Sequence, residues 1–425
     1  MTDTTTPRPA VEPVEAFAAR ARAWLAENMP RLDPDNPPRA GRDDEGAWQR
    51  ARELQQRLYA GGFAGICFPR QYGGLGLDVC YQKAFDVEAA GYELPLILNV
   101  PTFTICCATL LDTGTEAQKC QHIRAALRGE EVLVQLLSEP SGGSDLAGLT
   151  TRAQRDGRGW IIDGAKTWST SAFAADYGLL LARTDPTVPK HDGLTMFLVP
   201  IRAPGVTLRR IEQVDGSNEF CEEFFDGLRV DDSAVVGEVN KGWDVAGRLL
   251  FHERRAVGQG SEFASGRGRE RSEDSFADYF ALAVAVGMAE DPLTQDKIGR
   301  VLARRMVRDG LVEHVAAAMR EGALPPSAGS IIRLFHSDVT CLQVDTAMEI
   351  AGPFSVVDDE RGLLKVGERY LSRQTVALGG GSDEMARNVI AERVLGLPRE
   401  YAADRGVPFN QVRHNKPRRE GNTIR

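Results

Sequence analysis

The sequence predicts an α+β fold in three parts: an N-terminal helical domain, a central antiparallel β domain and a C-terminal helical bundle. Apolar residues recur at helical spacing up to Glu131, and short runs of strand-forming residues begin at Val132. The helical period returns from Gly242 onward. Such an order predicts separate helical and sheet layers around shared cores. The expected divisions are domains over residues 12–131, 132–240 and 241–400, and a polar tail over 401–425.

Four helices are expected in the N-terminal domain. The first carries apolar residues at helical spacing from Val14 and stops at Pro30, because proline cannot continue the backbone hydrogen bonds. The fourth follows Thr115, which belongs to a capping turn. The second, third and fourth are expected over residues 48–60, 81–92 and 116–128.

The central domain is predicted from short runs rich in β-branched and aromatic residues, with turn residues between them. Asp156-Gly157 and Asp163-Gly164 are both typical of hairpin turns, so the run from Lys166 to Thr170 is expected to return antiparallel to Trp160–Ile162. The strands are expected over residues 132–138, 150–153, 159–162, 166–171, 177–183, 194–200, 206–211 and 219–230.

The stretch from Glu139 to Thr170 combines a glycine-rich turn with strand residues of unusual chemistry. Trp168 and Thr170 are expected on one face of a strand, where an indole and a hydroxyl suit a planar heteroaromatic ring. From periodicity alone, a tryptophan in a strand is more often part of a core or an interface. The stretch by itself therefore leaves both interpretations open.

The C-terminal third predicts a bundle of long helices. A helix carrying Val245, Leu249 and Val257 precedes a polar, glycine-containing run over 258–275. The tail contains Arg413, Lys416, Arg418 and Arg419, which are either solvated or part of an arm that packs on a neighbouring subunit or a phosphate. The further helices are expected over residues 276–288, 293–319, 330–350 and 366–395.

Composition excludes several classes of protein. The chain has 425 residues, 42% hydrophobic and 26% charged, and its net charge of −9 argues against nucleic acid as the main partner. No run approaches the roughly 20 apolar residues that span a bilayer, and the N-terminus lacks a secretion pattern, so the cytoplasm is expected. The seven cysteines include no Cys-x-x-Cys pair, which indicates neither a disulfide framework nor a metal site.

Three separated motifs in this domain order resemble the acyl-CoA dehydrogenase family. They are Ser138-Glu139-Pro140-x-x-Gly143-Ser144-Asp145, Gly164-x-Lys166-x-Trp168, and the run Ile390-Ala391-Glu392-Arg393-Val394-Leu395-Gly396-Leu397-Pro398-Arg399. The resemblance spans nearly the whole chain. It implies FAD in a cleft between the β domain and the C-terminal bundle, with an acyl-CoA thioester lying on the flavin, and it is greatest to bacterial members acting on dicarboxylyl, branched or ring-bearing acyl groups.

The resemblance also assigns cofactor contacts residue by residue. Leu137 and Ser138 should lie along the flavin edge, Trp168 should flank the isoalloxazine ring, and Thr170 should hydrogen-bond near its N5 atom. Ser144 falls where the family contacts CoA or the pyrophosphate. Ser382 and Glu384 match positions that touch the cofactor near its ribityl and adenosine portions, and Asp383 should face the cofactor or a subunit contact.

The family's reaction removes an α-proton from the thioester while a β-hydride leaves to flavin N5, so a carboxylate base must face the flavin. Counting back from Arg387, the position that usually holds this glutamate is Gly380. Some members supply the base from the first long helix of the C-terminal domain, where this chain has Glu253. Glu253 is therefore the candidate base, although a solvated glutamate is the simpler reading of a helix. Gly380 would keep the N–H that polarises the thioester oxygen.

Two neighbouring assignments depend on the same resemblance. Arg254 is expected either to bind CoA or to orient Glu253, with a surface salt bridge as the competing reading, and His252 is expected to be incidental. Many members carry an arginine that reaches the FAD pyrophosphate of a neighbouring subunit. The corresponding region, residues 286–292, has none, and Arg300 and Arg304 are the nearest candidates to replace it.

The leading hypothesis is thus an FAD-dependent acyl-CoA dehydrogenase that passes electrons to an electron-transfer flavoprotein and forms a homodimer or homotetramer. One alternative keeps FAD but acts as an oxidase or dehydrogenase on a carrier-bound or non-CoA substrate. The other is a non-catalytic subunit of a heteromeric dehydrogenase. The presence of Trp168, Thr170 and Glu253 argues against a silent subunit, which has no chemical need for them.

Overall fold

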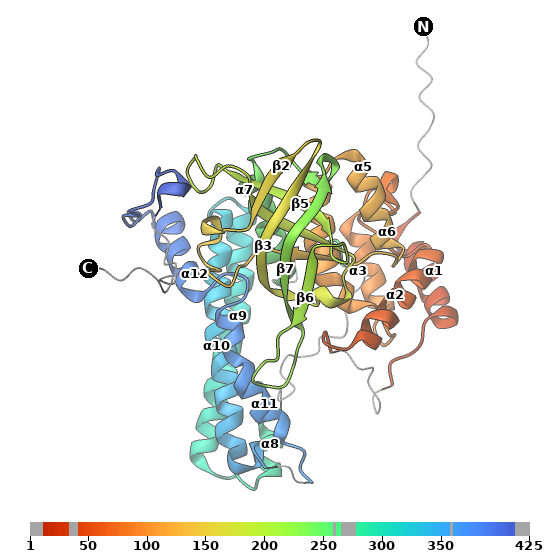
Figure 1. The fold of residues 1–425 in the computed structure, drawn as a ribbon. Helices are drawn as coiled ribbons and strands as arrows, with labels where there is room; N and C mark the ends of the chain where they lie inside the picture. The colour runs from red at the N-terminus through yellow and green to blue at the C-terminus, as the bar shows by residue number, and fades with distance from the viewer. Residues whose placement is uncertain (1–11, 34–40, 258–260, 265–277, 358–359, 413–425) are drawn as a thin grey trace, which may run out of the picture.

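The computed structural model describes residues 12–33, 41–257, 261–264, 278–357 and 360–412. A central sheet separates two groups of helices (Figure 1). The N-terminal helices pack on one side of the sheet. Most of the C-terminal helices lie on the other side, where α9 and α10 extend well beyond the sheet as a long rod, but α7 packs against η3 and α4 of the N-terminal group. The α+β architecture expected from the sequence is confirmed.

The N-terminal helices follow the predicted order. Asp44 caps α2 by accepting a hydrogen bond from the backbone N–H of Gly46. Thr115 and Gln118 form a reciprocal capping box at the start of the helix that continues to Leu127. The segments are α1 (Val14–Asn28), α2 (Glu45–Ala60), α3 (Val79–Glu88), α5 (Glu116–Gln118), η4 (Lys119–Ile123) and α6 (Arg124–Leu127).

One long helical stretch was not predicted. It contains η3 (Asn99–Cys107), which is a π-helix, and α4 (Ala108–Thr113). The 18-residue segment Leu96–Thr113 is long and apolar enough to cross a membrane by length and composition alone, but 61% of it is buried inside the protein. It packs against β1 and α7, so it is part of the core beside the site described below.

The sheet has eight strands in the order β6-β7-β3-β2-β4-β5-β8, and β1 pairs with β4. Most ladders are antiparallel, as expected, whereas β1 runs parallel to β4 with Gln135 opposite Leu179. The two-residue strand β8 was not predicted. The strands are β1 (Leu133–Leu136), β2 (Arg152–Asp156), β3 (Gly159–Thr170), β4 (Tyr177–Arg183), β5 (Leu194–Pro200), β6 (Val206–Arg210), β7 (Phe220–Asp231) and β8 (Val235–Val236).

The second predicted hairpin is wrong. Asp156-Gly157 does join two antiparallel strands, β2 and β3. Asp163-Gly164, however, lies inside β3, which continues without turning and pairs with β7 on both sides of a register shift between Ile162 and Gly164. The extra residue lies in β7, where Asp226 and Gly227 stand opposite Asp163, and the φ of +66° at Gly227 suits such a bulge, which bends a strand without ending it. The Trp168 segment therefore prolongs the Trp160 segment.

The C-terminal helices pack partly on the sheet and partly on one another. Leu249 of α7 belongs to the hydrophobic core that also contains Phe103 of η3 and Phe197 of β5. A smaller core joins α8, α9, α10 and α11. The expected interruption after α7 lies largely outside the described residues. The elements are α7 (Gly242–Val257), α8 (Tyr279–Ala285), α9 (Pro292–Arg320), α10 (Gly329–Ala351), α11 (Leu364–Ser372), η10 (Arg373–Ala377), α12 (Asp383–Val389) and η11 (Ile390–Val394).

The described start of the tail, up to residue 412, packs on the chain's own β domain. Phe409 is buried, with the guanidinium carbon of Arg183 3.4 Å from its ring centroid. Asp404 pairs with Lys190 at 2.6 Å, in the connection between β4 and β5. The tail's expected arm residues, Arg413, Lys416, Arg418 and Arg419, lie outside the described residues.

Candidate functional site

The ends of β1 and β3 are joined by hydrogen bonds that fix the residues assigned to the flavin edge. The Lys166 ammonium donates to the carbonyl oxygen of Leu137 at 2.9 Å. The backbone N–H of Thr167 donates to the carbonyl oxygen of Ser138 at 2.9 Å. Leu137 is buried and Ser138 half-buried. The end of β1 is therefore held through its own carbonyl oxygens, one bound by the Lys166 side chain and one by the backbone of Thr167.

Lys166 is fully enclosed and needs a compensating charge. Its Nζ atom lies 3.1 Å from Oε1 of Glu139, which is also buried. Burial alone would raise the pKa of Glu139, but the Lys166 ammonium and hydrogen bonds from Thr150 and Thr151 outweigh burial and lower that pKa to about 2. The two motifs that contain Glu139 and Lys166 thus meet as a buried ion pair next to Leu137 at the end of β1.

Trp168 lies on a bulge of β3. The register passes from Thr167 opposite Glu222 to Ser169 opposite Cys221, which leaves Trp168 as the extra residue, with φ of +63°. Its side chain is 57% exposed, whereas its neighbours Thr167 and Ser169 are buried and Thr170 is half-buried. An exposed indole on a residue with a strained backbone conformation is typical of a surface that binds a ligand or a partner.

The glycine-rich turn before β2 is open to solvent. Ser144 and Gly143 are exposed, and a Cβ atom on Gly143 would lie 3.7 Å from the Ser138 hydroxyl oxygen. Asp145 does not cap the following turn by a side-chain hydrogen bond; it pairs with Lys190 at 2.8 Å. The turn therefore offers exposed backbone and the Ser144 hydroxyl beside the end of β1.

Glu253 is carried by α7, which is fixed to α4 by two contacts. His252 Nε2 lies 2.9 Å from Oδ2 of Asp112, and Arg248 donates to the same oxygen at 2.6 Å. The His252 ring is thereby bound to Asp112, which agrees with the expectation that it takes no part in proton transfer. The helix turn places the next residue, Glu253, with its carboxyl directed inward.

The electrostatics of Glu253 are those of an enclosed carboxyl. Burial raises its pKa above the usual range, and this effect exceeds the opposing influences of a hydrogen bond from the Gln135 side chain and of the Arg254 charge. Its neighbours on the η3 side include the fully buried thiol of Cys106. A carboxyl with a raised pKa binds a proton more strongly, which is what a general base near neutral pH requires.

Glu253 and Gly380 are brought together although 126 residues separate them in the chain. A Cβ atom on Gly380 would lie 3.9 Å from Oε1 of Glu253, and Gly380 has φ of +68°. Among the described residues, the N–H of Gly380 has no hydrogen-bond partner. The site thus presents a carboxyl and an unused backbone donor side by side.

The Gly379–Gly381 loop is held by Arg333 of α10. The guanidinium donates to the carbonyl oxygens of Gly379 at 2.9 Å and Gly381 at 2.8 Å. It also pairs with Asp383 at 3.2 Å, and Ser337 donates to the same carboxylate at 2.9 Å. With both flanking carbonyls bound by Arg333, the loop has a defined geometry at Gly380.

The residues after the loop have partly different roles from those expected. Ser382 caps α12, its hydroxyl accepting from the N–H of Met385 at 3.3 Å, and Glu384 is exposed at the same helix end. Asp383 was expected to face the cofactor or a subunit contact, but it faces α10, where it bonds Arg333 and Ser337. The Asp383 carboxylate is therefore satisfied within the chain, by the half-buried Arg333 and the buried Ser337.

The cationic candidates differ in how they are paired. Arg254 is exposed and makes no hydrogen bond or ion pair within the described part of the chain; Glu253 and, more weakly, the like charge of Arg393 act on it electrostatically. The competing interpretation of Arg254 as part of a surface salt bridge therefore finds no support among the described residues. Arg300 pairs with Asp296 at 2.9 Å, and Arg304 pairs with Asp338 of α10. Arg300 and Arg304 are thus already neutralised within the bundle.

Sequence reasoning missed two residues of this site, Gln135 and Arg333. Gln135 is the polar exception in an apolar strand run, Val132–Leu137, and that exception is a usable signal. Arg333 has no local motif, because its partners lie near residue 380. Only the packing of α10 against the loop reveals its role.

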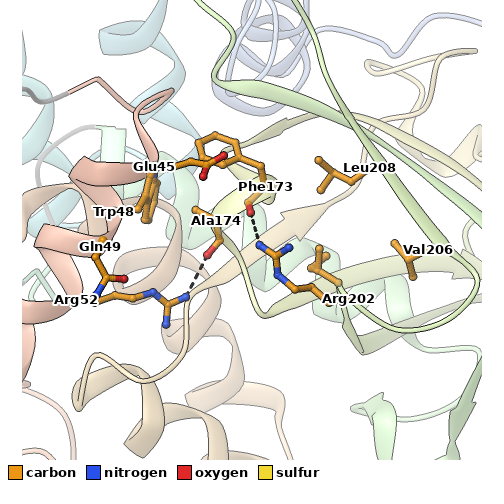
Figure 2. Close-up of a pocket in the computed structure, with 10 residues that line it drawn as sticks. Glu45, Trp48, Gln49, Arg52, Phe173, Ala174, Arg202, Val206 and Leu208 are labelled. Carbon is orange, nitrogen blue, oxygen red and sulfur yellow. Dashed lines mark hydrogen bonds between the residues drawn. The ribbon is translucent and has the colours of Figure 1, made fainter.

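A separate cavity of about 710 Å³ lies between α2 and the sheet (Figure 2). Arg52 and Arg202 line it and donate to the carbonyl oxygens of Ala174 and Phe173, at 3.1 and 2.7 Å. Both guanidinium groups are thus engaged by the wall itself. None of the sequence-predicted site residues lines this cavity.

Comparison with known proteins gives a consistent result. Models of the N-terminal, middle and C-terminal domains of acyl-CoA dehydrogenase match residues 12–130, 135–228 and 240–395. Acyl-CoA dehydrogenase IpdE1 of Mycobacterium tuberculosis is 33% identical over 396 residues, which cover 92% of this chain and 99% of that protein. The solved "Tcur3481-Tcur3483 steroid ACAD" has a TM-score of 0.72 and 29% identity, covering 92% and 99% of the two chains. The ChsE4-ChsE5 complex from Mycobacterium tuberculosis shares the fold, with a TM-score of 0.66, 24% identity, and coverage of 93% and 100%.

Enzymes of the matching family use FAD, and the residues present here fit it. Trp168 offers an open aromatic surface, and the glycine-rich turn at Gly143 leaves room beside Ser138. The Glu253 carboxyl lies beside Gly380, whose N–H has no partner among the described residues. The fold, this constellation and the three matching domain models together show that the chain belongs to the acyl-CoA dehydrogenase family.

Proposed function

We propose that this chain dehydrogenates an acyl-CoA thioester with Glu253 as the base that removes the α-proton. The observation that carries the proposal is the approach of Glu253 Oε1 to Gly380, the position where the commoner family glutamate is missing. Glu253 thus occupies the same part of the site from a different helix. Its raised pKa suits it to accept a proton.

The remaining groups have complementary roles in this proposal. When bound, FAD supplies the acceptor for the hydride that leaves the β-carbon. The free N–H of Gly380 donates to the thioester oxygen and stabilises the negative charge that develops there. Arg333 keeps that donor in place through its contacts with Gly379 and Gly381. Catalysis by positioned donors and an enclosed base requires no further protein nucleophile.

We assign the cofactor contacts to the sheet side of the site. Leu137, Ser138, Trp168 and Thr170 line the ring, since the two strand ends that carry them are joined by hydrogen bonds. Ser144 lies beside them for CoA or the pyrophosphate, and Ser382 and Glu384 at the start of α12 are assigned to the more distal part of FAD. Arg254 is exposed and forms no ion pair among the described residues, although it lies within the electrostatic influence of Glu253, and we assign it to the phosphates of CoA.

The substrate class that we propose is a bulky, ring-bearing acyl-CoA. The absence of a side chain at Gly380 leaves space next to the base. The related solved enzyme is named a steroid acyl-CoA dehydrogenase, which supports a polycyclic acyl group here. An electron-transfer flavoprotein is the proposed electron acceptor.

We further propose that the active enzyme is an oligomer. Arg300 and Arg304 are bound within their own bundle, so a cation for the FAD pyrophosphate must come from elsewhere. A second copy in a homodimer or homotetramer lacks that arginine in the same place. A different acyl-CoA dehydrogenase chain would supply it, and the two-component names of the related structures favour this heteromeric arrangement.

The test is anaerobic bleaching of the flavin band by a polycyclic acyl-CoA, with straight-chain acyl-CoAs for comparison. Glu253→Gln should bind flavin and acyl-CoA but bleach at least about a thousandfold more slowly, because the base is lost. Glu313→Gln removes an exposed carboxylate of α9 and should bleach like the wild type. Full bleaching by Glu253→Gln would contradict the assigned base, and rapid peroxide formation on turnover would favour an oxidase. A purified chain without flavin that gains it on mixing with a second chain would establish the heteromer.

A further inference from the structure

Gln135 on β1 is a polar side chain in a strand whose other members, Leu133, Val134 and Leu136, are fully buried. Its side chain contacts the carboxyl of Glu253 and lowers the pKa of that carboxyl. Only a hydrogen-bond donor stabilises a carboxylate in this way, so the contacting group is the amide N–H₂ of Gln135. The strand that ends at the flavin edge thus also reaches the proposed base.

The other end of the same amide has no partner. Oε1 of Gln135 is buried and accepts no hydrogen bond within the described part of the chain. A buried amide oxygen without a hydrogen-bond partner lowers the stability of the folded protein, so its presence calls for a functional explanation. An amide beside a carboxyl provides one, because it can donate to the ionised carboxylate and, after rotation, accept from the protonated carboxyl.

We propose that Gln135 is a positioning residue for Glu253, holding the base in the orientation for α-proton removal and accepting its O–H once the proton has moved. The inference rests on the proposed function, since it assumes that Glu253 is the base. The proton passes from the α-carbon to Glu253, and Gln135 gives up and gains none. Its role is to supply a matching hydrogen bond in each protonation state.

The other groups around Glu253 do not duplicate this role. Arg254 follows it on α7 and favours the charged carboxylate at longer range, with Arg393 of η11 beyond it. The Cys106 thiol of η3 is neutral, because burial raises its pKa well above the usual range. Gly380 brings a backbone donor but no ionisable group. Gln135 is therefore the side chain whose loss should move the titration of Glu253 without changing a charge.

The experiment compares Gln135→Met, which keeps length and bulk, with Gln55→Met as a matched control. Gln55 is a buried glutamine whose Oε1 is, like that of the half-buried Gln135, without a partner, but its amide donates to the carbonyl oxygen of Leu127, away from the site. The measurement is the pH dependence of flavin bleaching, together with carboxyl infrared difference spectra of each protein against its Glu253→Gln version. The spectra report the Glu253 titration without turnover.

We expect the Gln135→Met midpoint to move to higher pH by about one unit, which corresponds to the loss of one hydrogen bond to a charged group. Bleaching should also slow about tenfold at pH values above the midpoint, because the carboxylate is no longer held in the orientation for α-proton removal, with little change in the half-saturating acyl-CoA concentration. Gln55→Met should keep the wild-type midpoint even if it lowers thermal stability. If Gln135→Met does not accumulate, Gln135→Asn, which withdraws the amide by one methylene, should show the same direction of shift.

The two proposals fail in different ways. Full bleaching by Glu253→Gln would overturn Glu253 as the base and the inference with it. If Glu253→Gln is inactive but the Glu253 carboxyl titrates at the same pH with Gln, Met or Asn at position 135, Gln135 does not position the base and this inference alone is wrong. An equal shift in the Gln55→Met control would also overturn it.

Discussion

The Oε1 atom of Glu253 lies 3.9 Å from where a Cβ atom of Gly380 would be, so the proposed base and the proposed backbone donor to the thioester oxygen are neighbours. Gly380 adopts φ of +68°, a conformation that costs an L-residue with a side chain roughly 1–2 kcal/mol. The loop therefore depends on glycine for its conformation and for the space beside the carboxyl.

Gly380→Ala should lower the rate of flavin reduction by about tenfold or more, because the methyl group strains the loop and displaces the donor. The flavin content should not change. Gly379→Ala is the matched control: its φ lies outside the left-handed region, and its Cβ would meet nothing closer than the Thr375 carbonyl oxygen at 3.5 Å. Stopped-flow reduction of the three proteins would decide, and equal rates would contradict a special role for Gly380.

Trp168→Ala should weaken FAD binding while leaving the apoprotein about as stable as the wild type. The indole is 57% exposed, so its removal takes little from the core, whereas aromatic stacking on a ring contributes about 1 kcal/mol. We expect a roughly fivefold higher FAD dissociation constant by fluorescence titration. Tyr401→Ala removes an exposed aromatic elsewhere and should bind FAD normally. A lower unfolding free energy with unchanged FAD affinity would instead make Trp168 a packing residue.

The sequence predicts elements well where its local signals are complete. α1, β4 and β5 match their expected positions, since Pro30 follows α1 and turn residues flank the two strands. The helix over 99–113 was missed because it is buried on nearly every side and so lacks the polar face that makes a helical period visible. Asp163-Gly164 suggested a turn because a bulge and a hairpin use the same residues; the pairing of β3 with β7 decides between them.

The candidate site likewise has a part that the sequence predicts and a part that only the structure reveals. The Glu139–Lys166 pair joins two motifs that are recognisable in the sequence, and the structure shows why both are needed. The proximity of Glu253 to Gly380, and of Arg333 to the glycine loop, arises only when α7, α10 and the loop pack together. Contacts between residues far apart in the chain leave no periodic trace, so only a family resemblance pointed to Glu253, and nothing pointed to Arg333.

Arg333→Met should reduce the rate of flavin reduction without abolishing flavin binding. The guanidinium bonds the carbonyls on either side of Gly380, and its loss lets the N–H move relative to the thioester oxygen. Displacements of about 1 Å can cost around a hundredfold in rate, so we expect a decrease of about ten- to a hundredfold in kcat. Arg304→Met is the control. It removes an arginine of α9 that pairs with Asp338 of α10, away from the glycine loop, and the variant should keep the wild-type rate. A changed thermal midpoint with an unchanged kcat would mean that Arg333 only stabilises the fold.

Glu223 should make the protein less stable as pH rises from about 4.5 to about 8. Burial raises its pKa to about 8 and outweighs the hydrogen bond that Ser169 donates at 2.9 Å. In this window the folded state holds a proton that the unfolded state has lost, so the free energy of unfolding falls with increasing pH, by up to ~1.4 kcal/mol per unit from this one group.

Glu223→Gln keeps an acceptor for Ser169 and cannot ionise, so its unfolding free energy should rise relative to the wild type across that window and level off above pH ~8. Glu222→Gln, one residue earlier on β7 and only half-buried, should follow the wild-type slope. Denaturant unfolding at a series of pH values measures both. Parallel curves for wild type and Glu223→Gln would show that Glu223 is ionised in the folded protein, with Lys166, opposite it on β3, as the nearest cation to balance it.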